Sequence, residues 1–300
     1  MYSVTIPTLN AAKIWPLFAP ALLACAAPGQ VLIIDSESTD GTVELARTAG
    51  FQVCSVKRAD FKHGGTRQMA AEMQPHVEIL VYMTQDAVLA GPSALANLVA
   101  AFSDPQVGAA YGRQLPRPEA NAIEAHARNF NYPETSQVRS LASRTQLGIR
   151  AAFLSNSLAA YRRSALMQVG GFPKNVIFGE DMVTAARLLL AGYKVAYVAE
   201  ACAYHSHPYT EVQEFRRYFD IGVLHSREHW LLEEFGRTHG EGKRFVLSEL
   251  KYLWHHDVLR IPSALLRTWI KFFGYRLGRL EAGIAPNVKR RLSMHSKYWT

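Results

Sequence analysis

The fold is indicated most clearly by one stretch of the sequence, Val31-Leu-Ile-Ile-Asp35-Ser-Glu-Ser-Thr-Asp40-Gly-Thr42. Its first four residues form a continuous apolar run, which is typical of a strand buried on both faces of a parallel sheet. The polar residues from Asp35 to Thr42 predict a turn and the cap of a helix that begins near Val43. A buried strand followed directly by a capped helix is the repeating unit of an α/β fold.

The same alternation of strands and helices extends over the N-terminal third of the chain. The expected strands cover residues 2–6, 31–34, 51–56 and 78–83, and the expected helices cover 11–26, 43–49 and 65–74, with another opening at Pro92. This spacing predicts an α/β fold with a mostly parallel sheet and helices on both faces, like the nucleotide-binding half of a Rossmann fold. In such sheets ligands bind beyond the carboxyl ends of the strands.

Beyond Val107 the pattern becomes irregular and then helical. Short helices are expected near 120–130 and at 161–169 and 181–191, with a last strand at 194–198. Longer helices are expected at 212–235, 243–259 and 263–280. We therefore expect three parts, residues 1–110, 111–210 and 211–300, of which the last is a C-terminal helical extension.

The charge of the chain is unevenly distributed. The 300 residues carry 33 Lys and Arg against 25 Asp and Glu, and the last 60 residues, with 12 Lys and Arg against four Asp and Glu, account for the whole net charge of +8. A neutral body without a recognised nucleic-acid motif argues against nucleic-acid binding. The three cysteines form no Cys-x-x-Cys pair and predict a reducing, cytoplasmic compartment. No apolar run reaches the ~18 residues of a membrane-spanning helix.

Two polar segments follow expected strands near the N-terminus. Asp35 and Asp40 lie in an acidic loop that suits hydrogen bonding to a ribose or to a base N–H, although an Asx turn and helix cap explain the same pattern. No Gly-x-Gly-x-x-Gly or P-loop motif is present, which excludes the usual dinucleotide and triphosphate sites. In His63-Gly-Gly-Thr-Arg67 the glycines favour an anion at a helix N-terminus within reach of Arg67. The alternative is a flexible turn with a surface arginine.

Carboxylates and histidines follow the later strands. Asp86 comes directly after the strand at 78–83 and suits a divalent cation that bridges phosphates, or a helix cap. His205 and His207 alternate after the last strand, so both side chains point the same way and suit a metal shell, although a single histidine is more often structural.

Glu180 and Asp181 form the remaining pair of candidate residues. Both open an apolar helix, where one carboxylate is explained by the unpaired amides and the dipole of the helix. The second is free to act as a base toward a sugar hydroxyl. No nucleophile elbow or Ser/His/Asp order is apparent, so nucleophilic catalysis is disfavoured.

Together these motifs resemble those of glycosyltransferase family 2. The matching segments are Ile6-Pro-Thr-Leu-Asn10, Ile34-Asp-Ser-Glu-Ser-Thr-Asp-Gly-Thr42, Thr84-Gln-Asp-Ala87 and Gly179-Glu-Asp181. Three further segments are similar to those of bacterial rhamnosyltransferases within the family: His63-Gly-Gly-Thr-Arg67, His205-Ser-His207 and Arg217-Tyr-Phe-Asp-Ile-Gly222. The resemblance covers roughly residues 2–225 and implies a GT-A fold and inverting transfer from a nucleotide diphospho-sugar.

The resemblance also implies roles for individual residues. The donor-binding set would be Pro7, Thr8, Asp35, Ser36, Asp40, His63, Arg67, Gln85 and Asp86, with Thr8 and Asp35 at the nucleoside and Arg67 at the diphosphate. Asp86 would bind Mg²⁺ or Mn²⁺, with His205 or His207 as a further ligand. Asp181 would be the general base, with Glu180 beside it.

Two departures from the family pattern affect these expectations. Thr84 replaces the first carboxylate of the usual Asp-x-Asp motif, so metal affinity is expected to be weak unless the histidines compensate. The common Ala-Arg-Asn is Thr66-Arg67-Gln68, which retains the arginine and changes its polar neighbour.

The function implied is transfer of L-rhamnose from dTDP-rhamnose to a lipid-linked or cell-envelope glycan. One alternative is a family 2 transferase that uses another nucleotide sugar. The other is a nucleotidyltransferase, against which the missing glycine-rich triphosphate loop argues. In residues 243–280 aromatic and aliphatic residues interleave with cations, which favours a peripheral helix on the cytoplasmic face of the inner membrane. Packing of this apolar face on the catalytic domain or on a partner subunit is the alternative.

Overall fold

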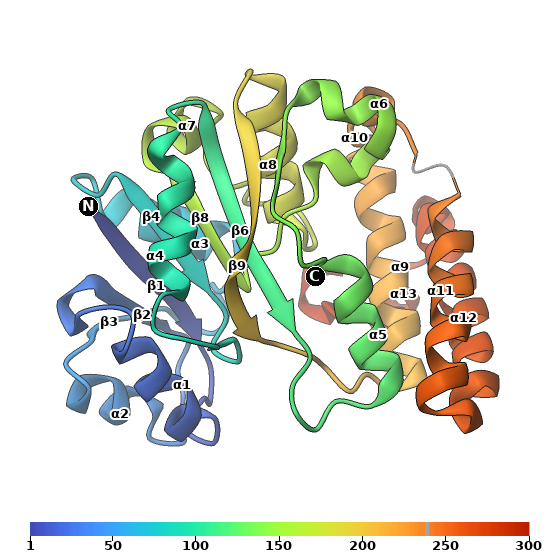
Figure 1. Cartoon of the computed structure of the whole chain (residues 1–300), viewed down its shortest axis with the longest axis horizontal. Coiled ribbons are helices and arrows are strands. Elements are labelled where there is room, and N and C mark those ends of the chain that lie inside the picture. The colour runs from blue at the N-terminus through green and yellow to red at the C-terminus, as the bar shows by residue number, and fades with distance from the viewer. Residues whose placement is uncertain (238–239, 300) are drawn as a thin grey trace.

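The computed structural model describes residues 1–237 and 240–299 and contains one nine-stranded sheet (Figure 1). The strands are β1 (Tyr2–Thr8), β2 (Val31–Asp35), β3 (Gln52–Ser55), β4 (Ile79–Met83), β5 (Val88–Leu89), β6 (Val107–Leu115), β7 (Gln137–Arg139), β8 (Leu158–Arg162) and β9 (Lys194–Tyr204). Their order in the sheet is β3-β2-β1-β4-β8-β6-β9-β5, with β7 paired to β9. The pairs among β1 to β4 are all parallel, and so is β6–β9. The expected α/β sheet is confirmed, and β8 makes it mixed because it runs against both of its neighbours.

Helices cover both faces of this sheet (Figure 1). In the first two thirds of the chain they are α1 (Trp15–Leu23), α2 (Thr42–Thr48), α3 (His63–Met73), α4 (Ala94–Ala100), α5 (Ala122–Asn131), α6 (Arg144–Leu147), α7 (Arg163–Gln168) and α8 (Glu180–Leu190). The C-terminal part adds α9 (Glu211–Arg227), α10 (Trp230–Phe235), α11 (Glu241–His256), α12 (Ile261–Arg279) and α13 (Pro286–Leu292). Short 3-10 segments lie between several of these helices.

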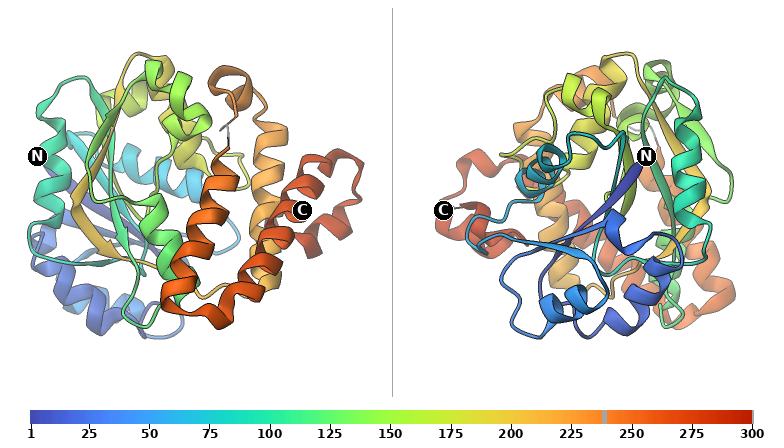
Figure 2. Two further views of the ribbon diagram at one scale, coloured as in Figure 1. Left: turned by 45° about the vertical axis from the view of Figure 1, so that its right-hand side comes forward. Right: turned by 90° about the vertical axis from the view of Figure 1, so that its left-hand side faces the viewer.

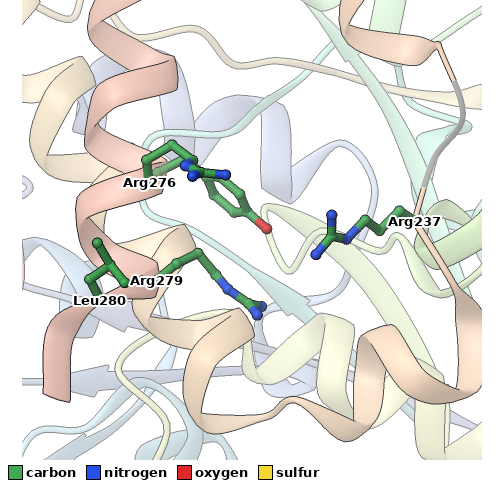
Figure 3. Close-up of a pocket in the computed structure, with 5 residues that line it drawn as sticks. Arg237, Arg276, Arg279 and Leu280 are labelled. Atoms are coloured by element: carbon green, nitrogen blue, oxygen red, sulfur yellow. The ribbon is translucent and has the colours of Figure 1, made fainter.

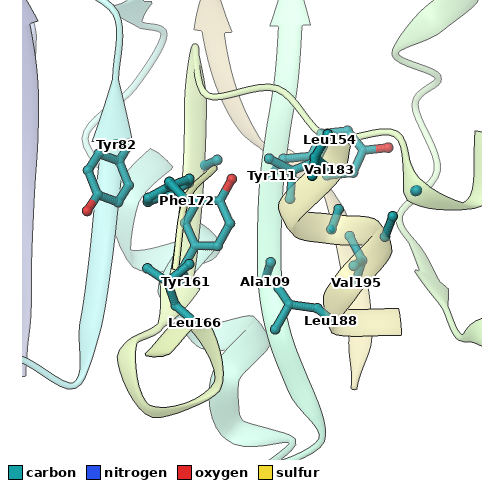
Figure 4. Close-up of a cluster of buried hydrophobic side chains, with 14 of the residues drawn as sticks. Tyr82, Ala109, Tyr111, Leu154, Tyr161, Leu166, Phe172, Val183, Leu188 and Val195 are labelled. Carbon is teal, nitrogen blue, oxygen red and sulfur yellow. The ribbon is translucent and has the colours of Figure 1, made fainter. Parts of the chain in front are cut away.

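The two faces of the sheet explain the continuous apolar run in β2. Leu32 and Ile34 belong to the core that includes residues of α3, α7 and α8, and Ile33 belongs to the opposite core with residues of α1 and α4. Because successive side chains of a strand point to opposite faces, a strand buried on both sides must be apolar at every position. Figure 4 shows the first core, in which Tyr82 and Phe172 meet edge to face with 5.2 Å between ring centroids.

Several elements differ from the sequence expectations. β5 and β7 were not expected, and the single helix expected at 212–235 is divided into α9 and α10. β6 was not expected, the helix expected at 161–169 begins as strand β8, and β9 continues beyond residue 198 to Tyr204. β6 and β8 are rich in Gly and Ala, which are weak strand formers, and they become strands because neighbouring strands pair with them on both sides. The division into three parts remains a prediction, and β6 crosses the boundary expected at residue 110.

The C-terminal helices pack on the rest of the chain through α9, whose Phe219 and Val223 enter the first core, and through α11, which lies against α5 (Figure 2). Where α9 and α12 lie side by side, Gly222, Gly274 and Gly278 allow their backbones to approach closely. A Cβ at Gly278 would lie 2.0 Å from the carbonyl oxygen of Phe219. Of the helices that the structure describes, none has the length and hydropathy needed to span a membrane.

We expect Gly278→Ala to destabilise the protein by about 1–3 kcal/mol, because overpacking at a close backbone approach forces the helices apart. The matched control is Gly283→Ala, since a Cβ there meets nothing within 4 Å. Urea unfolding measures both. Equal midpoints for the two variants would show that α9 and α12 tolerate separation.

Candidate functional site

A cavity of about 490 Å³ lies at the edge of the sheet where β4 and β9 end. Asp86 follows β4, and His205 and His207 follow β9, while α3 contributes Arg67 and the start of α8 contributes Asp181. The remaining wall comes from β6, α5, residues 149–157, α9 and the C-terminal segment of the chain. The structure thus brings the candidate base, arginine and metal ligands together in one cavity.

Asp181 is held at the first turn of α8, directly after Gly179. Gly179 adopts a φ of +75°, and a Cβ there would meet Leu224 at 2.8 Å, so both conformation and space favour glycine. Asp181 Oδ1 accepts the amide hydrogen of Met182 at 2.9 Å, and Oδ2 accepts that of Asn156 at 3.1 Å. Burial and the neighbouring charge of Glu180 raise the pKa of Asp181 above its usual range. A carboxylate with a raised pKa lies closer to the operating pH and is a better general base.

Glu180 is buried and is paired through one of its carboxylate oxygens. Arg67 NH1 donates to Glu180 Oε1 at 2.7 Å, and Asn156 Nδ2 donates to the same oxygen at 3.1 Å. Both members of the ion pair are nearly inaccessible to solvent. The alternative of a surface arginine at position 67 is therefore wrong. Removing one partner of such a buried pair typically costs about 3–5 kcal/mol. Glu180 therefore supports Asp181, and Asp181 is the carboxylate free to act.

Of the two glycines before Arg67, only Gly64 serves close packing in this structure. A Cβ at Gly64 would lie 1.9 Å from the carbonyl oxygen of Pro173, in the loop that leads to α8. At Gly65 the nearest atom would be an ordinary 3.5 Å away. The requirement for glycine is thus explained at Gly64 by the approach of this loop, and anion binding at the start of α3 stays a prediction. His63 lines the catalytic cavity.

Asp86, His205 and His207 form a compact cluster. Asp86 Oδ1 lies 3.4 Å from His205 Nε2, and Asp86 Oδ2 lies 3.6 Å from His207 Nε2. One oxygen or nitrogen atom from each of the three side chains lies within 4.8 Å of the others. This is the spacing that a shared cation would require, so the structure confirms that these residues form a possible metal site.

Gln114 fixes the way in which His205 faces the cluster. Arg128 donates to Gln114 Oε1, and because a guanidinium only donates, this atom is the amide oxygen. His205 Nδ1 lies 2.9 Å from the same oxygen and must donate its hydrogen to it. Nε2 of His205 then faces Asp86, and in metal-bound histidines the second ring nitrogen is likewise held by a hydrogen bond from outside the site.

The protonation states of the cluster also fit a cation. Burial and the neighbouring His205 lower the pKa of His207 to about 4, which keeps its imidazole neutral near pH 7. Burial alone would raise the pKa of Asp86, but the hydrogen bond and charge of His205 outweigh it and hold this pKa below its usual range. A carboxylate and two imidazole nitrogens are ordinary ligands for a divalent metal.

The expected nucleoside residues lie along the same edge, at the ends of β1, β2 and β4. Asp35 is buried and accepts hydrogen bonds from the hydroxyls of Thr8 and Ser38, at 2.9 and 2.6 Å. Ser36 Oγ donates to the carbonyl of Thr8, the residue that follows Pro7, at 2.8 Å. Gln85 bridges both backbone groups of Leu9, at 2.7 and 3.0 Å. Asp40 accepts the Ala12 amide at 2.9 Å and so joins two loops.

The comparisons with known proteins show which family the chain belongs to. The family model described as "Glycosyltransferase like family 2" matches residues 2–219. The chain belongs to this glycosyltransferase family. It is an enzyme of the transferase class, and the family resemblance read from the motifs is confirmed.

This family 2 enzyme is similar to two curated proteins over most of its length. It is 45% identical to the O-antigen chain rhamnosyltransferase RfbN of Salmonella typhimurium, over 99% of this chain and 95% of the relative. It is also 45% identical to the O-antigen chain rhamnosyltransferase WbaN of Salmonella anatum, over 91% of this chain and 86% of the relative.

Solved structures confirm the GT-A fold. A mannosyltransferase from Pyrobaculum calidifontis, in complex with GDP-Man and Mn²⁺, aligns with a TM-score of 0.57 at 20% identity over 99% of this chain and 84% of that one. S. aureus TarS residues 1–349, in complex with UDP-GlcNAc, aligns with a TM-score of 0.54 at 13% identity over 94% and 91%. At these identities the likeness concerns the fold.

Several residues of the family 2 site were not expected from the sequence. Asn156 bonds to both Glu180 and Asp181, and Gln114 orients His205. Arg128 and Arg217 line the cavity, as does His295 near the C-terminus. Arg217 lies in a segment that resembles bacterial rhamnosyltransferases but had no role assigned to it, and the others come from stretches without a local motif, so only the folded chain reveals that they share one cavity.

Proposed function

We propose that this enzyme transfers L-rhamnose, with inversion, from dTDP-rhamnose to a growing O-antigen glycan carried by a lipid. The observation that carries the proposal is 45% identity to two O-antigen chain rhamnosyltransferases, over 99% and 91% of this chain. The cavity supports it, because partly buried Asp181 lines the same cavity as Asp86, His205 and His207, which could hold a cation for a diphosphate. Membership of the glycosyltransferase family favours sugar transfer over nucleotidyl transfer.

Asp181 is assigned to the acceptor hydroxyl. As the hydroxyl oxygen forms its bond to the anomeric carbon, its proton passes to Asp181, and the bond from that carbon to the diphosphate breaks with the electron pair leaving on the diphosphate. A single displacement of this kind inverts the anomeric configuration. Glu180 takes no proton in this scheme, since its pairing with Arg67 holds its pKa below the usual range against the effect of burial.

Donor binding is assigned to the carboxyl edge of the sheet. Thr8 and Asp35 would contact the nucleoside, with Pro7, Ser36, Asp40 and Gln85 shaping the loops around it. Arg67 is occupied by Glu180, so Arg128 and Arg217 are better placed to meet the diphosphate, with His63 at the cavity wall. Among the described residues neither arginine has a carboxylate partner within salt-bridge distance.

A divalent cation would be held by Asp86, His205 and His207. When bound it would stabilise the negative charge that develops on the leaving diphosphate. Two imidazole ligands beside one carboxylate favour Mn²⁺ over Mg²⁺, because Mg²⁺ prefers oxygen ligands. The histidines thereby replace the carboxylate that Thr84 does not provide.

Peripheral contact with the cytoplasmic face of the inner membrane is the last part of the proposal. In residues 243–280 large apolar side chains remain exposed, with Trp254 at 70%, Leu259 at 88% and Trp269 at 62%. Leu265, Trp269, Phe272, Phe273 and Arg276 recur at spacings that place them on one face of α12. This face would lie in the interfacial region of the bilayer.

A cationic cavity continues this face of α12. Figure 3 shows Arg237, Arg276 and Arg279 around a cavity of about 310 Å³, and no carboxylate is among the described residues that line it. Such a cavity suits the phosphate of an anionic lipid headgroup, and each cation near an anionic surface contributes about 1 kcal/mol. The described part of the chain thus offers apolar and cationic groups side by side.

The first test is release of dTDP from dTDP-rhamnose in the presence of lipid-linked acceptor, against a panel of other nucleotide sugars. We expect Asp181→Asn to lower transfer about 10²–10⁴-fold, the usual contribution of a general base. Donor binding should survive, because Asp181 is not among the residues assigned to the donor and the amide oxygen keeps one of its two backbone contacts. Asp60→Asn, the same change at an exposed site that does not line the cavity, serves as the control. Normal turnover by Asp181→Asn would contradict the assignment.

The pH profile gives a second view of the same group. Asp181 must be unprotonated to accept the hydroxyl proton, so kcat/KM should rise as the pH rises through its pKa. Because this pKa is raised in the folded enzyme, the acidic limb should lie above the ~3.9 of an ordinary aspartate. A profile flat down to pH 4 would assign the base elsewhere.

Removal of the metal should abolish most activity, and added Mn²⁺ should restore it. His207→Ala is expected to weaken Mn²⁺ binding, measured by titration calorimetry, at least about tenfold. The exposed His255 on α11 gives the control variant, His255→Ala. Full activity in EDTA would reject the metal assignment.

Vesicles of phosphatidylglycerol should bind the wild-type protein at low salt and release it at high salt. Trp269→Ala combined with Phe273→Ala should weaken binding at least about tenfold, because each buried aromatic side chain contributes roughly 1.5 kcal/mol or more. Leu17→Ala, which removes another exposed apolar side chain on α1, should bind normally. Absence of binding, or loss of a dimer in the double variant, would favour packing on a second copy instead.

A further inference from the structure

The loop that delivers the catalytic carboxylates has little support from its own backbone. It runs from Gly171 to Gly179, between α7 and α8. Among the backbone hydrogen bonds of turns and loops in the described part of the chain, none is donated by a main-chain amide of residues 174–178. Segments of this kind open easily unless side chains hold them. The loop must therefore be fixed by contacts from elsewhere.

One side of the loop rests on α3. The Phe172 amide donates to Gln68 Oε1 at 2.9 Å, and the Pro173 carbonyl approaches Gly64. These contacts hold the beginning of the loop. Its end, which leads directly into Glu180 and Asp181, lies farther along and is contacted by another part of the chain.

That other part is the C-terminal segment, residues 293–299. The ring of His295 is stacked on Phe178, with 5.8 Å between centroids and planes 9° apart, and it meets His63 edge-on at 5.5 Å. The hydroxyl of Tyr298 donates to the carbonyl of Asn175 at 3.1 Å. The segment thus touches the loop at two points, one of them directly before Gly179. Burial, with the neighbouring His63, lowers the pKa of His295 to about 4, so the stacked ring is neutral.

The C-terminal segment is itself firmly anchored. Asp220 on α9 accepts the amide hydrogen of Met294 at 2.9 Å, next to His295. Trp299 is 7% exposed and lies between the cations of Arg227 and Lys289, each 5.0 Å from its ring. An anchored segment can hold a loop, whereas a free chain end would not.

We propose that His295 is a positioning residue of the transferase, which fixes the loop through Phe178 and thereby the placement of Asp181. The C-terminal segment lies outside residues 2–219, which the family model matches, so this support is added to the family core by the C-terminal helices. The kinetic part of this inference rests on the proposed function, and its structural part does not.

The test compares His295→Ala, His295→Phe and the exposed control Lys297→Ala. Hydrogen–deuterium exchange of a peptide covering residues 174–180 needs no substrate. We expect faster exchange in His295→Ala alone, because phenylalanine keeps the flat ring against Phe178. A peptide from β2 serves as the internal reference for global unfolding.

In the transfer assay kcat should fall about 10–100-fold in His295→Ala, since misplacing a reacting group by about 1 Å has this effect. The donor KM should change less than threefold, and His295→Phe should recover most of the rate. Unchanged exchange in His295→Ala, or a phenylalanine variant as impaired as the alanine variant, would overturn the proposal. If the wild type accepts no rhamnosyl donor, the proposed function fails while the exchange result still decides the role of His295.

Discussion

The buried pair between Arg67 and Glu180 is the interaction on which the catalytic cavity depends. It joins α3 to the first turn of α8 with both charges almost out of water, a state that is stable only while both partners remain and their hydrogen bonds are made. Asn156 supplies one of these bonds and also reaches Asp181, so three segments far apart in sequence are fixed by one small network. The pair stabilises the site chiefly because removal of either partner would leave the other charge buried and unpaired.

The same pair divides the work between two adjacent carboxylates. Glu180 receives the guanidinium and stays ionised, and its fixed charge adds to burial in raising the pKa of Asp181. Neighbouring groups in nearly the same place thus acquire opposite properties because only one of them faces a cation. Across the cavity, His205 keeps Asp86 ionised while His207 remains neutral. The cavity therefore combines Asp181, a carboxylate with a raised pKa, with a cluster of side chains that could bind a cation.

The parts of this arrangement that the sequence predicts are those with local causes. Three features can each be recognised from a few consecutive residues: the apolar run of β2, the acidic turn after it and the carboxylates at the start of α8. Together they predict the fold and the base. β8 could not be predicted this way, since Leu158-Ala-Ala-Tyr-Arg162 is a strand only because β4 and β6 flank it. Arg67 was expected to be a diphosphate ligand because its motif is local, whereas its partner lies 113 residues away. Long-range pairing of this kind leaves no local pattern to read.

α9 connects the chemistry to the C-terminal part of the chain. Arg217 and Leu224 of α9 line the catalytic cavity. Gly222 of the same helix lies against α12, so closely that a Cβ there would be 2.3 Å from the Tyr275 carbonyl oxygen. Asp220, between these positions, anchors the segment that brings His295 to the cavity. Because packed helices at backbone contact move as one body, α12 cannot shift at a lipid surface without α9 following. The basic C-terminal helices are therefore mechanically part of the catalytic domain, and a membrane contact on α12 would orient the cavity toward an acceptor held in the same bilayer.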